Sequence, residues 1–209
     1  MPLKKIDIGQ ELGKGWRLFQ PNMGVLIVAS VIATLVSAVT CGILSGPLMA
    51  GMFLVVRRLM KDDPVKPQAG DVFKGFDYFV QALILMVLCL VVMFLLAMIP
   101  VIGQLAGLVV GSFMFWGIMF VTYQKLPAID ACKRIFELLK SGEFTLPLVF
   151  GIIVSVISSL GVIACVVGMF FTIPLGYCMM ACCYETLFGG EPEVIEPVKE
   201  AAPPADMRL

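Results

Sequence analysis

The sequence predicts an all-α membrane protein with six transmembrane helices paired as three hairpins. Of its 209 residues 60% are apolar, and the mean hydropathy is +1.00, whereas about half of the residues of a soluble domain are apolar. Three long stretches contain no charged residue: residues 18–56, 78–124 and 144–184. Because about 20 helical residues cross a bilayer, each stretch can hold two spans and a turn.

The distribution of basic residues predicts the orientation of these hairpins. All 15 Lys and Arg side chains lie outside the uncharged stretches, and none lies in the turns expected near residues 40–45, 100–104 and 164–168. By the positive-inside rule, the segments that connect the hairpins face the cytoplasm. Both termini are therefore expected on the cytoplasmic side of a multi-pass membrane protein.

A short motif recurs ahead of each hairpin at a spacing of sixty residues. In each copy the apolar residues follow an i, i+4, i+7 pattern, which predicts an amphipathic helix in the plane of the membrane surface. The spacing makes Trp16, Phe76 and Phe136 equivalent, and we predict that they anchor the three helices at the interface. The copies are KGWRLFQ (residues 14–20), KGFDYFV (residues 74–80) and RIFELLK (residues 134–140).

This recurrence predicts one membrane domain, residues 1–190, with an approximate threefold repeat. Each repeat unit contains an amphipathic helix followed by a hairpin, with bounds of about 8–66, 67–126 and 127–190. Residues 191–209 are rich in Pro, Glu and Ala. They cannot bury enough apolar surface to order themselves, so a disordered cytoplasmic tail is predicted.

A row of glycines opens the fourth predicted span. Gly103, Gly107 and Gly111 stand four residues apart on one helix face. Small residues at this spacing let two helix backbones approach closely. We expect this face to pack within the six-helix bundle; packing against a second copy of the chain is the alternative.

Sulfur-bearing side chains gather in the sixth predicted span. Cys178, Cys182 and Cys183 lie in the segment YCMMACCYE, residues 177–185, and such ligands suit Cu(I). Cysteine and methionine are also ordinary apolar fillers of helices, and no His or carboxylate joins them inside the span. The favoured interpretation is packing, so no metal and no cofactor is predicted.

The titratable residues exclude several kinds of chemistry. The chain has no histidine, which excludes an imidazole acid–base mechanism. No ionisable carboxylate or amine lies within a predicted span, where proton-coupled transporters place their relays. The segment KDDP, residues 61–64, offers two carboxylates that could hold Mg²⁺, but a solvated turn is the favoured interpretation. The net charge of zero gives no indication of nucleic-acid binding.

Four segments carry a family resemblance. Over about residues 8–190 the chain resembles a group of uncharacterised bacterial integral-membrane proteins, which are similar to the membrane domain of some glycerophosphoryl diester phosphodiesterases. The resemblance implies a bacterial inner membrane and no catalytic residues, because the phosphodiesterase chemistry belongs to a separate soluble domain. The segments are GWRLF (residues 15–19), GPLMAG (46–51), PAIDACKRIFELLKSGEF (127–144) and IPLGYCMMACCYETLFGG (173–190).

Three functions stay open from the sequence. The favoured one is a non-enzymatic membrane module that interacts with lipids, with other membrane proteins or with a second copy of itself. The alternative is a transporter or channel component for a small neutral or apolar solute, which the internal repetition favours. The third hypothesis, a lipid-modifying enzyme, is supported by residues 61–64 alone.

Overall fold

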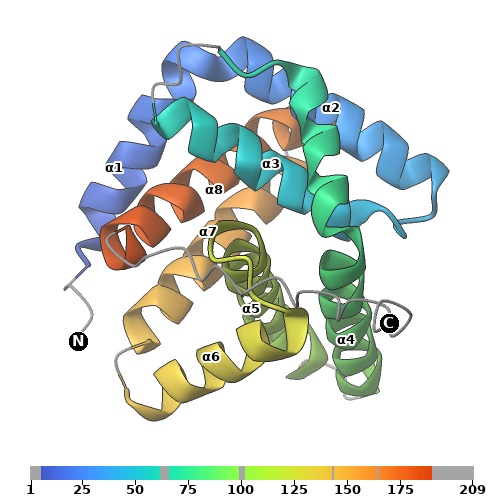
Figure 1. Cartoon of the computed structure of the whole chain (residues 1–209), viewed down its shortest axis with the longest axis vertical. Coiled ribbons are helices and arrows are strands. Elements are labelled where there is room, and N and C mark those ends of the chain that lie inside the picture. The colour runs from blue at the N-terminus through green and yellow to red at the C-terminus, as the bar shows by residue number, and fades with distance from the viewer. Residues whose placement is uncertain (1–5, 62–65, 99–101, 143, 164, 190–209) are drawn as a thin grey trace, which may run out of the picture.

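The computed structural model describes residues 6–61, 66–98, 102–142, 144–163 and 165–189. All regular structure within these ranges is helical, as the sequence predicts (Figure 1). The α-helices and the two 3₁₀ helices (η) are α1 (Ile8–Phe19), η1 (Gln20–Asn22), α2 (Met23–Val39), α3 (Ser45–Met60), η2 (Ala69–Tyr78), α4 (Phe79–Ala97), α5 (Ile102–Tyr123), α6 (Ala128–Lys140), α7 (Thr145–Ile163) and α8 (Cys165–Phe188).

Several of these helices are long and apolar enough to cross a membrane. Three helical stretches meet this description: Ile8–Val39, Ala69–Leu96 and Ala106–Tyr123. A fourth arises if α6 and α7, bent by 116° at their junction, count together as one span. The helix α3 has only 16 residues and ends on Arg57 and Arg58, so it is shorter than an average span. The chain is thus an all-helical protein with at least three candidate membrane spans.

Local sequence explains where the short amphipathic elements begin and end. The Asp7 side chain caps α1 by accepting hydrogen bonds from the backbone N–H groups of Gly9 and Gln10. At the start of η2, Gln68 and Asp71 form a reciprocal capping box. The helix α6 starts after Pro127 and ends at Lys140, and Gly142 follows the C-cap with a φ of +76° that suits a glycine.

The core lies where α3, α5 and α8 meet, and these helices occupy the middle of the molecule (Figure 1). Phe53 of α3 packs edge-to-face on Tyr123 of α5 and on Tyr177 of α8, with ring centroids 6.3 and 4.9 Å apart. Trp116 of α5 and Phe150 of α7 are also fully buried. Burying such aromatic side chains is a large stabilising contribution.

The helices α2 and α4 lie at the periphery and expose apolar side chains. On α2 the exposed residues include Val28 and Leu35, and on α4 they include Val91, Phe94 and Leu95. An apolar surface of this extent is unusual on a soluble monomer. It is the surface expected of a helix that faces lipid.

Each of the three short amphipathic elements packs against a long helix: η2 and α6 contact the long helix that precedes them, and α1 contacts the distant helix α8. The helix α1 lies along α8, η2 lies across α3, and α6 lies against α5 and α4. Each of the three is followed by two long helices that contact each other: α2 with α3, α4 with α5, and α7 with α8. Two predictions lie outside the described residues, namely most of KDDP at 62–64 and the tail at 191–209.

Candidate functional site

The contact of η2 with α3 is the closest between any amphipathic element and its neighbour in the described part of the chain. A Cβ atom built on Gly75 would collide with the Pro47 carbonyl oxygen and lie 2.8 Å from Cα of Gly51. A Cβ atom on Gly51 would collide with the backbone of Val72 in turn. The absence of a side chain at Gly51 and Gly75 allows the two backbones to approach so closely. This contact leaves no space between η2 and α3.

Charged groups join η2 to α3 beside these glycines. Arg58 Nη1 donates a hydrogen bond to Asp71 Oδ2 at 2.8 Å, and Lys74 Nζ lies 2.9 Å from Asp71 Oδ1. The hydrogen bond from Lys74 is the largest of the effects that lower the pKa of the Asp71 carboxyl below its usual value. The carboxylate is therefore kept ionised and held between the two elements.

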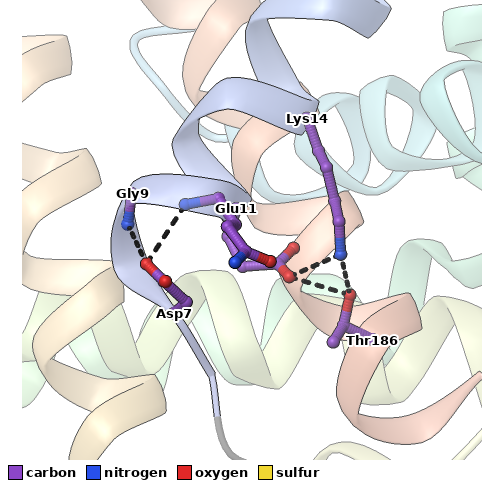
Figure 2. A network of polar contacts seen from close by, with 6 residues as sticks. Asp7, Gly9, Glu11, Lys14 and Thr186 are labelled. Carbon is purple, nitrogen blue, oxygen red and sulfur yellow. Dashed lines mark hydrogen bonds and ion pairs between the residues drawn. The ribbon is translucent and has the colours of Figure 1, made fainter.

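The contact of α1 with α8 is built in a similar way (Figure 2). A Cβ atom on Gly15 would lie 2.6 Å from Cα of Met179. Lys14 Nζ donates to Glu11 Oε1 at 2.7 Å and to Thr186 Oγ1 at 3.1 Å, and the Thr186 hydroxyl donates to Glu11 Oε1 at 3.1 Å. The Glu11 side chain is only 3% exposed. A buried carboxylate with charged and hydroxyl partners thus joins the first helix to the last.

The contact of α6 with its neighbours lacks both of these features. The residue sixty positions after Gly75 is Ile135, and the one sixty after Asp71 is Ala131; both are buried. The first backbone N–H of α6, at Ala128, donates to Gln81 Oε1 of α4 at 2.8 Å. Phe136 of α6 meets a ring of α5 with centroids 5.6 Å apart. A β-branched side chain in place of glycine keeps α6 from lying directly on a neighbouring backbone.

An apolar groove remains beside α6, and we call it the α6 groove. It has a volume of about 380 Å³ and no polar surface, and it is formed by α4, α5, α6 and the start of α7. Burial raises the pKa of the Cys132 thiol in it above the usual value, so this thiol stays neutral. The lining residues are Leu88, Cys89, Val92, Val109, Val110, Phe113, Cys132, Phe136, Leu139 and Leu148.

The opposite face of α6 is charged. Lys133 Nζ lies 3.1 Å from Asp130 Oδ1, in an ion pair that is largely exposed to solvent. Arg134 and Lys140 add two more positive charges to this helix, and Glu137 adds a negative one. The helix therefore presents a net positive face next to the α6 groove.

A separate polar cavity of about 250 Å³ lies at the ends of α3, α5 and α8. Arg57 Nη1 donates to the Tyr123 carbonyl at 3.3 Å, and the guanidinium carbon lies 4.6 Å from the centroid of the Tyr123 ring. Arg57 Nε lies 3.9 Å from a carboxylate oxygen of Glu185. The Tyr123 hydroxyl donates to the Phe53 carbonyl at 2.9 Å and is fully buried. These aromatic side chains close the cavity toward the core.

The three predicted interfacial residues lie on the amphipathic elements α1, η2 and α6. Trp16 on α1 and Phe136 on α6 are 41% and 57% exposed. Phe76 on η2 is half-buried and stacks on Phe79, with centroids 6.0 Å apart. Their depth in a membrane stays a prediction.

The predicted glycine row is placed on α5 between α4 and α7. A Cβ atom on Gly107 would lie 3.2 Å from the methyl carbon of Met93, which belongs to α4. A Cβ atom on Gly111 would lie 3.6 Å from the Ser155 hydroxyl of α7, which is an ordinary contact. Gly103 lies in the first turn of α5. None of the neighbours of Gly107 and Gly111 is a backbone, unlike those of Gly51 and Gly75.

The three candidate sulfur ligands lie on α8. Cys178 and Cys183 are buried in the core, and Cys182 is half-buried. Within the described ranges, no group of three or more His, Cys, Asp or Glu side chains is placed to hold a metal ion. These cysteines contribute to the packing of α8.

Sequence reasoning did not single out the glycines that make the closest contacts. Gly15 and Gly75 occupy the same place in the repeated motifs KGWRLFQ and KGFDYFV, and Gly51 ends the segment GPLMAG. The signal was therefore present in the motif itself, since glycine is unfavourable inside a helix without a packing reason. The α6 groove had no comparable signal, because it is formed only when side chains from four consecutive helices, α4 to α7, pack together.

Comparison of the chain with protein-family models, with curated proteins and with solved structures gave no match. The family resemblance therefore stays a prediction. The function has to be inferred from the geometry of the chain itself.

Proposed function

We propose that this chain is a non-enzymatic integral membrane protein of the bacterial inner membrane that binds membrane lipid in the α6 groove. The single observation that carries the proposal is an entirely apolar groove of about 380 Å³ beside an amphipathic helix with a basic outer face. The groove is apolar, as an acyl chain is. The phosphate of an anionic lipid would then meet the basic face of α6. Each Lys or Arg near such a surface contributes about 1 kcal/mol.

The proposal includes six spans, formed by the pairs α2–α3, α4–α5 and α7–α8, with both termini in the cytoplasm. The order of the elements supports it, because an amphipathic element precedes each pair. The short helix α3 fits as a span if the long side chains of Arg57 and Arg58 extend to the headgroups. The amphipathic elements then lie on the cytoplasmic side, where the positive-inside rule puts their basic residues.

The same order supports the threefold repeat. Each amphipathic element contacts the second long helix of another pair: η2 contacts α3, α6 contacts α5, and α1 contacts α8. A cyclic arrangement of this kind is expected when one unit is copied three times and the copies close on themselves. Two of the three contacts are closed by glycines and carboxylates, and the third leaves the α6 groove open.

Transport of a small neutral solute, the alternative prediction, has less support from the geometry. A transport path needs polar surface along the bundle axis, and the polar cavity beside Arg57 ends on buried aromatic rings. Phe53 and Tyr123 fill the space between α3 and α5 there, with ring centroids 6.3 Å apart. The α6 groove opens sideways between helices, which suits a lipid better than a solute in water.

A pair of neighbouring valines on α4 allows a matched test of lipid binding. Val92 lines the α6 groove, whereas the exposed Val91 lies outside it. The protein would be purified in mild detergent, and the phospholipid that remains bound would be measured by native mass spectrometry. Val92→Phe should fill part of the groove and remove the bound lipid, and Val91→Phe should keep it. Equal lipid retention by both variants would refute the proposal.

A further inference from the structure

A second cavity contains an unusual share of sulfur. This cavity, which we call the sulfur cavity, has a volume of about 370 Å³ and lies between the α2–α3 turn, α4 and α5. Five of the twelve lining residues carry sulfur: Cys41, Met86, Cys89, Met93 and Met114. The chain has 14 methionines and 7 cysteines among 209 residues, or one residue in ten. Random packing would therefore place about one such residue there, not five.

Two of these sulfur atoms, those of Met86 and Met93, lie against other residues that line the cavity. The Ser45 hydroxyl donates a hydrogen bond to the Met86 thioether at 3.0 Å, and Ser45 itself lines the cavity. The Met93 thioether lies over Gly107, where a Cβ atom would lie 3.7 Å from the Met93 sulfur. The Met93 thioether therefore packs directly beside Gly107, which also lines the cavity.

The turn after α2 places a thiol at the edge of the same cavity. Cys41 has a φ of +51°, a left-handed conformation that non-glycine residues seldom adopt. Gly42 follows with a φ of +83° and completes the tight turn. Cys41 is exposed and carries a free thiol. It is therefore accessible to an ion arriving from the solvent side.

We propose that the sulfur cavity binds a soft monovalent metal ion of the Cu(I) or Ag(I) type. Thioether and thiolate ligands select such ions over hard cations, and no carboxylate lines this cavity. The long, flexible methionine side chains can close around an ion without movement of the helices. Loss of the proton from a cysteine thiol on binding balances the charge of the ion. This site is distinct from the cysteines of α8 and lies next to the α6 groove, with which it shares Cys89 and Val110.

Silver binding to the purified full-length protein tests this proposal, because Ag(I) undergoes no redox change. The cavity variant combines Met86→Leu, Met93→Leu and Met114→Leu, which keep the apolar volume and remove the thioethers. The control variant changes three buried methionines elsewhere to leucine. They are Met119, Met179 and Met180.

Isothermal titration in chloride-free buffer should detect one Ag(I) per chain in the unaltered protein and in the control variant. The cavity variant should lose affinity by about tenfold or more. Equal affinity in the cavity variant and the unaltered protein, or an equal loss in the control variant, would overturn the proposal.

A second measurement needs no methionine variant and stays informative if one of them fails to fold. Cys41 is exposed, so a maleimide reagent should alkylate it in the unaltered protein. Peptide mass spectrometry follows the rate at this residue with and without Ag(I). Binding predicts a clear slowing of the alkylation of Cys41, and an unchanged rate would also overturn the proposal.

Discussion

Two amphipathic elements pack against long helices in opposite ways: η2 against α3, and α6 against α5 and α4. At η2, Gly75 meets Gly51, and Asp71 binds Arg58 across the contact. At α6, the corresponding positions are occupied by Ile135 and Ala131. The first contact is closed and polar at its edge, whereas the second leaves an apolar groove of about 380 Å³.

In the proposed function, this difference separates a structural contact from one that binds lipid. A glycine pair brings backbones together and removes the space that a ligand could use. A branched apolar side chain holds the helix away from its neighbour and leaves surface uncovered, which in water would be unfavourable. In a membrane the uncovered surface is available to an acyl chain. The α6 contact is therefore the place to look for a bound lipid.

The largest loss of stability is expected from adding a side chain at Gly75. Gly75→Ala puts a methyl group against the Pro47 carbonyl and the Gly51 backbone, which cannot move aside as a flexible side chain can. We expect a loss of about 3 kcal/mol in the free energy of unfolding, at the upper end for an overpacked site. Thermal unfolding in detergent would measure it.

The control for this change lies in the same element. Gly70 has nothing within 4 Å of a built Cβ atom, so Gly70→Ala should leave the midpoint of unfolding nearly unchanged. If Gly75→Ala were as stable as Gly70→Ala, the closed contact of η2 with α3 would be wrong.

A smaller effect is expected at the glycine row that the sequence singled out. Gly107→Leu places its side chain against the Met93 thioether, the movable end of a side chain, and not against a backbone. We expect a destabilisation of about 1 kcal/mol, because the methionine can adopt another rotamer. A change in thermal stability as large as that of Gly75→Ala would mean that α4 and α5 approach each other more closely than in this structure.

The smallest effects are expected from the charges beside the two contacts. Asp71→Asn removes a hydrogen-bonded ion pair with Arg58 that is about four-fifths buried on the Asp71 side, and it should cost about 1 kcal/mol. Asp130→Asn on α6 removes an exposed pair with Lys133 and should cost almost nothing. Chemical unfolding of the two variants side by side would measure the difference. Equal costs would mean that the charges do not distinguish the two contacts.

Acid should produce the same difference without a mutation. Because the pKa of Asp71 is lower in the folded chain than in the unfolded chain, its contribution is present above its ordinary pKa of 3.8. The contribution decreases as the pH falls below that value and protons bind to the carboxylate. The stability advantage of the unaltered protein over Asp71→Asn should therefore shrink below about pH 4.

The sequence predicted the all-helical class and the position of individual helices, because these depend on local signals. The segment from Pro127 to Gly142 was expected to form a helix, and α6 runs from Ala128 to Lys140 between these two residues. Uncharged stretches and motifs a few residues long were sufficient for this. The number of membrane spans is harder to infer from the sequence, because α3 is only 16 residues long and carries two arginines at its end.

The candidate sites could not be predicted in the same way. The α6 groove is lined by side chains of α4, α5, α6 and α7, so it exists only once these four helices are in place. The sulfur cavity likewise joins Cys41 to Met114, which are separated by more than seventy residues. The sequence showed the cysteines of α8 because they are adjacent, whereas the sulfur atoms that line a cavity come from three separate segments.

Tryptophan fluorescence offers the most direct test of a lipid-filled groove beside α6. The chain has two tryptophans, Trp16 and Trp116, and Trp116 is fully buried, so it provides a constant background. In a Trp16→Phe chain, Phe136→Trp places a fluorophore at the α6 groove. The protein would be reconstituted in vesicles of phospholipid with brominated acyl chains, and iodide would be added to the water as the opposing quencher. We predict strong quenching by the brominated chains and little by iodide; quenching by iodide alone would place the groove in water and contradict lipid binding.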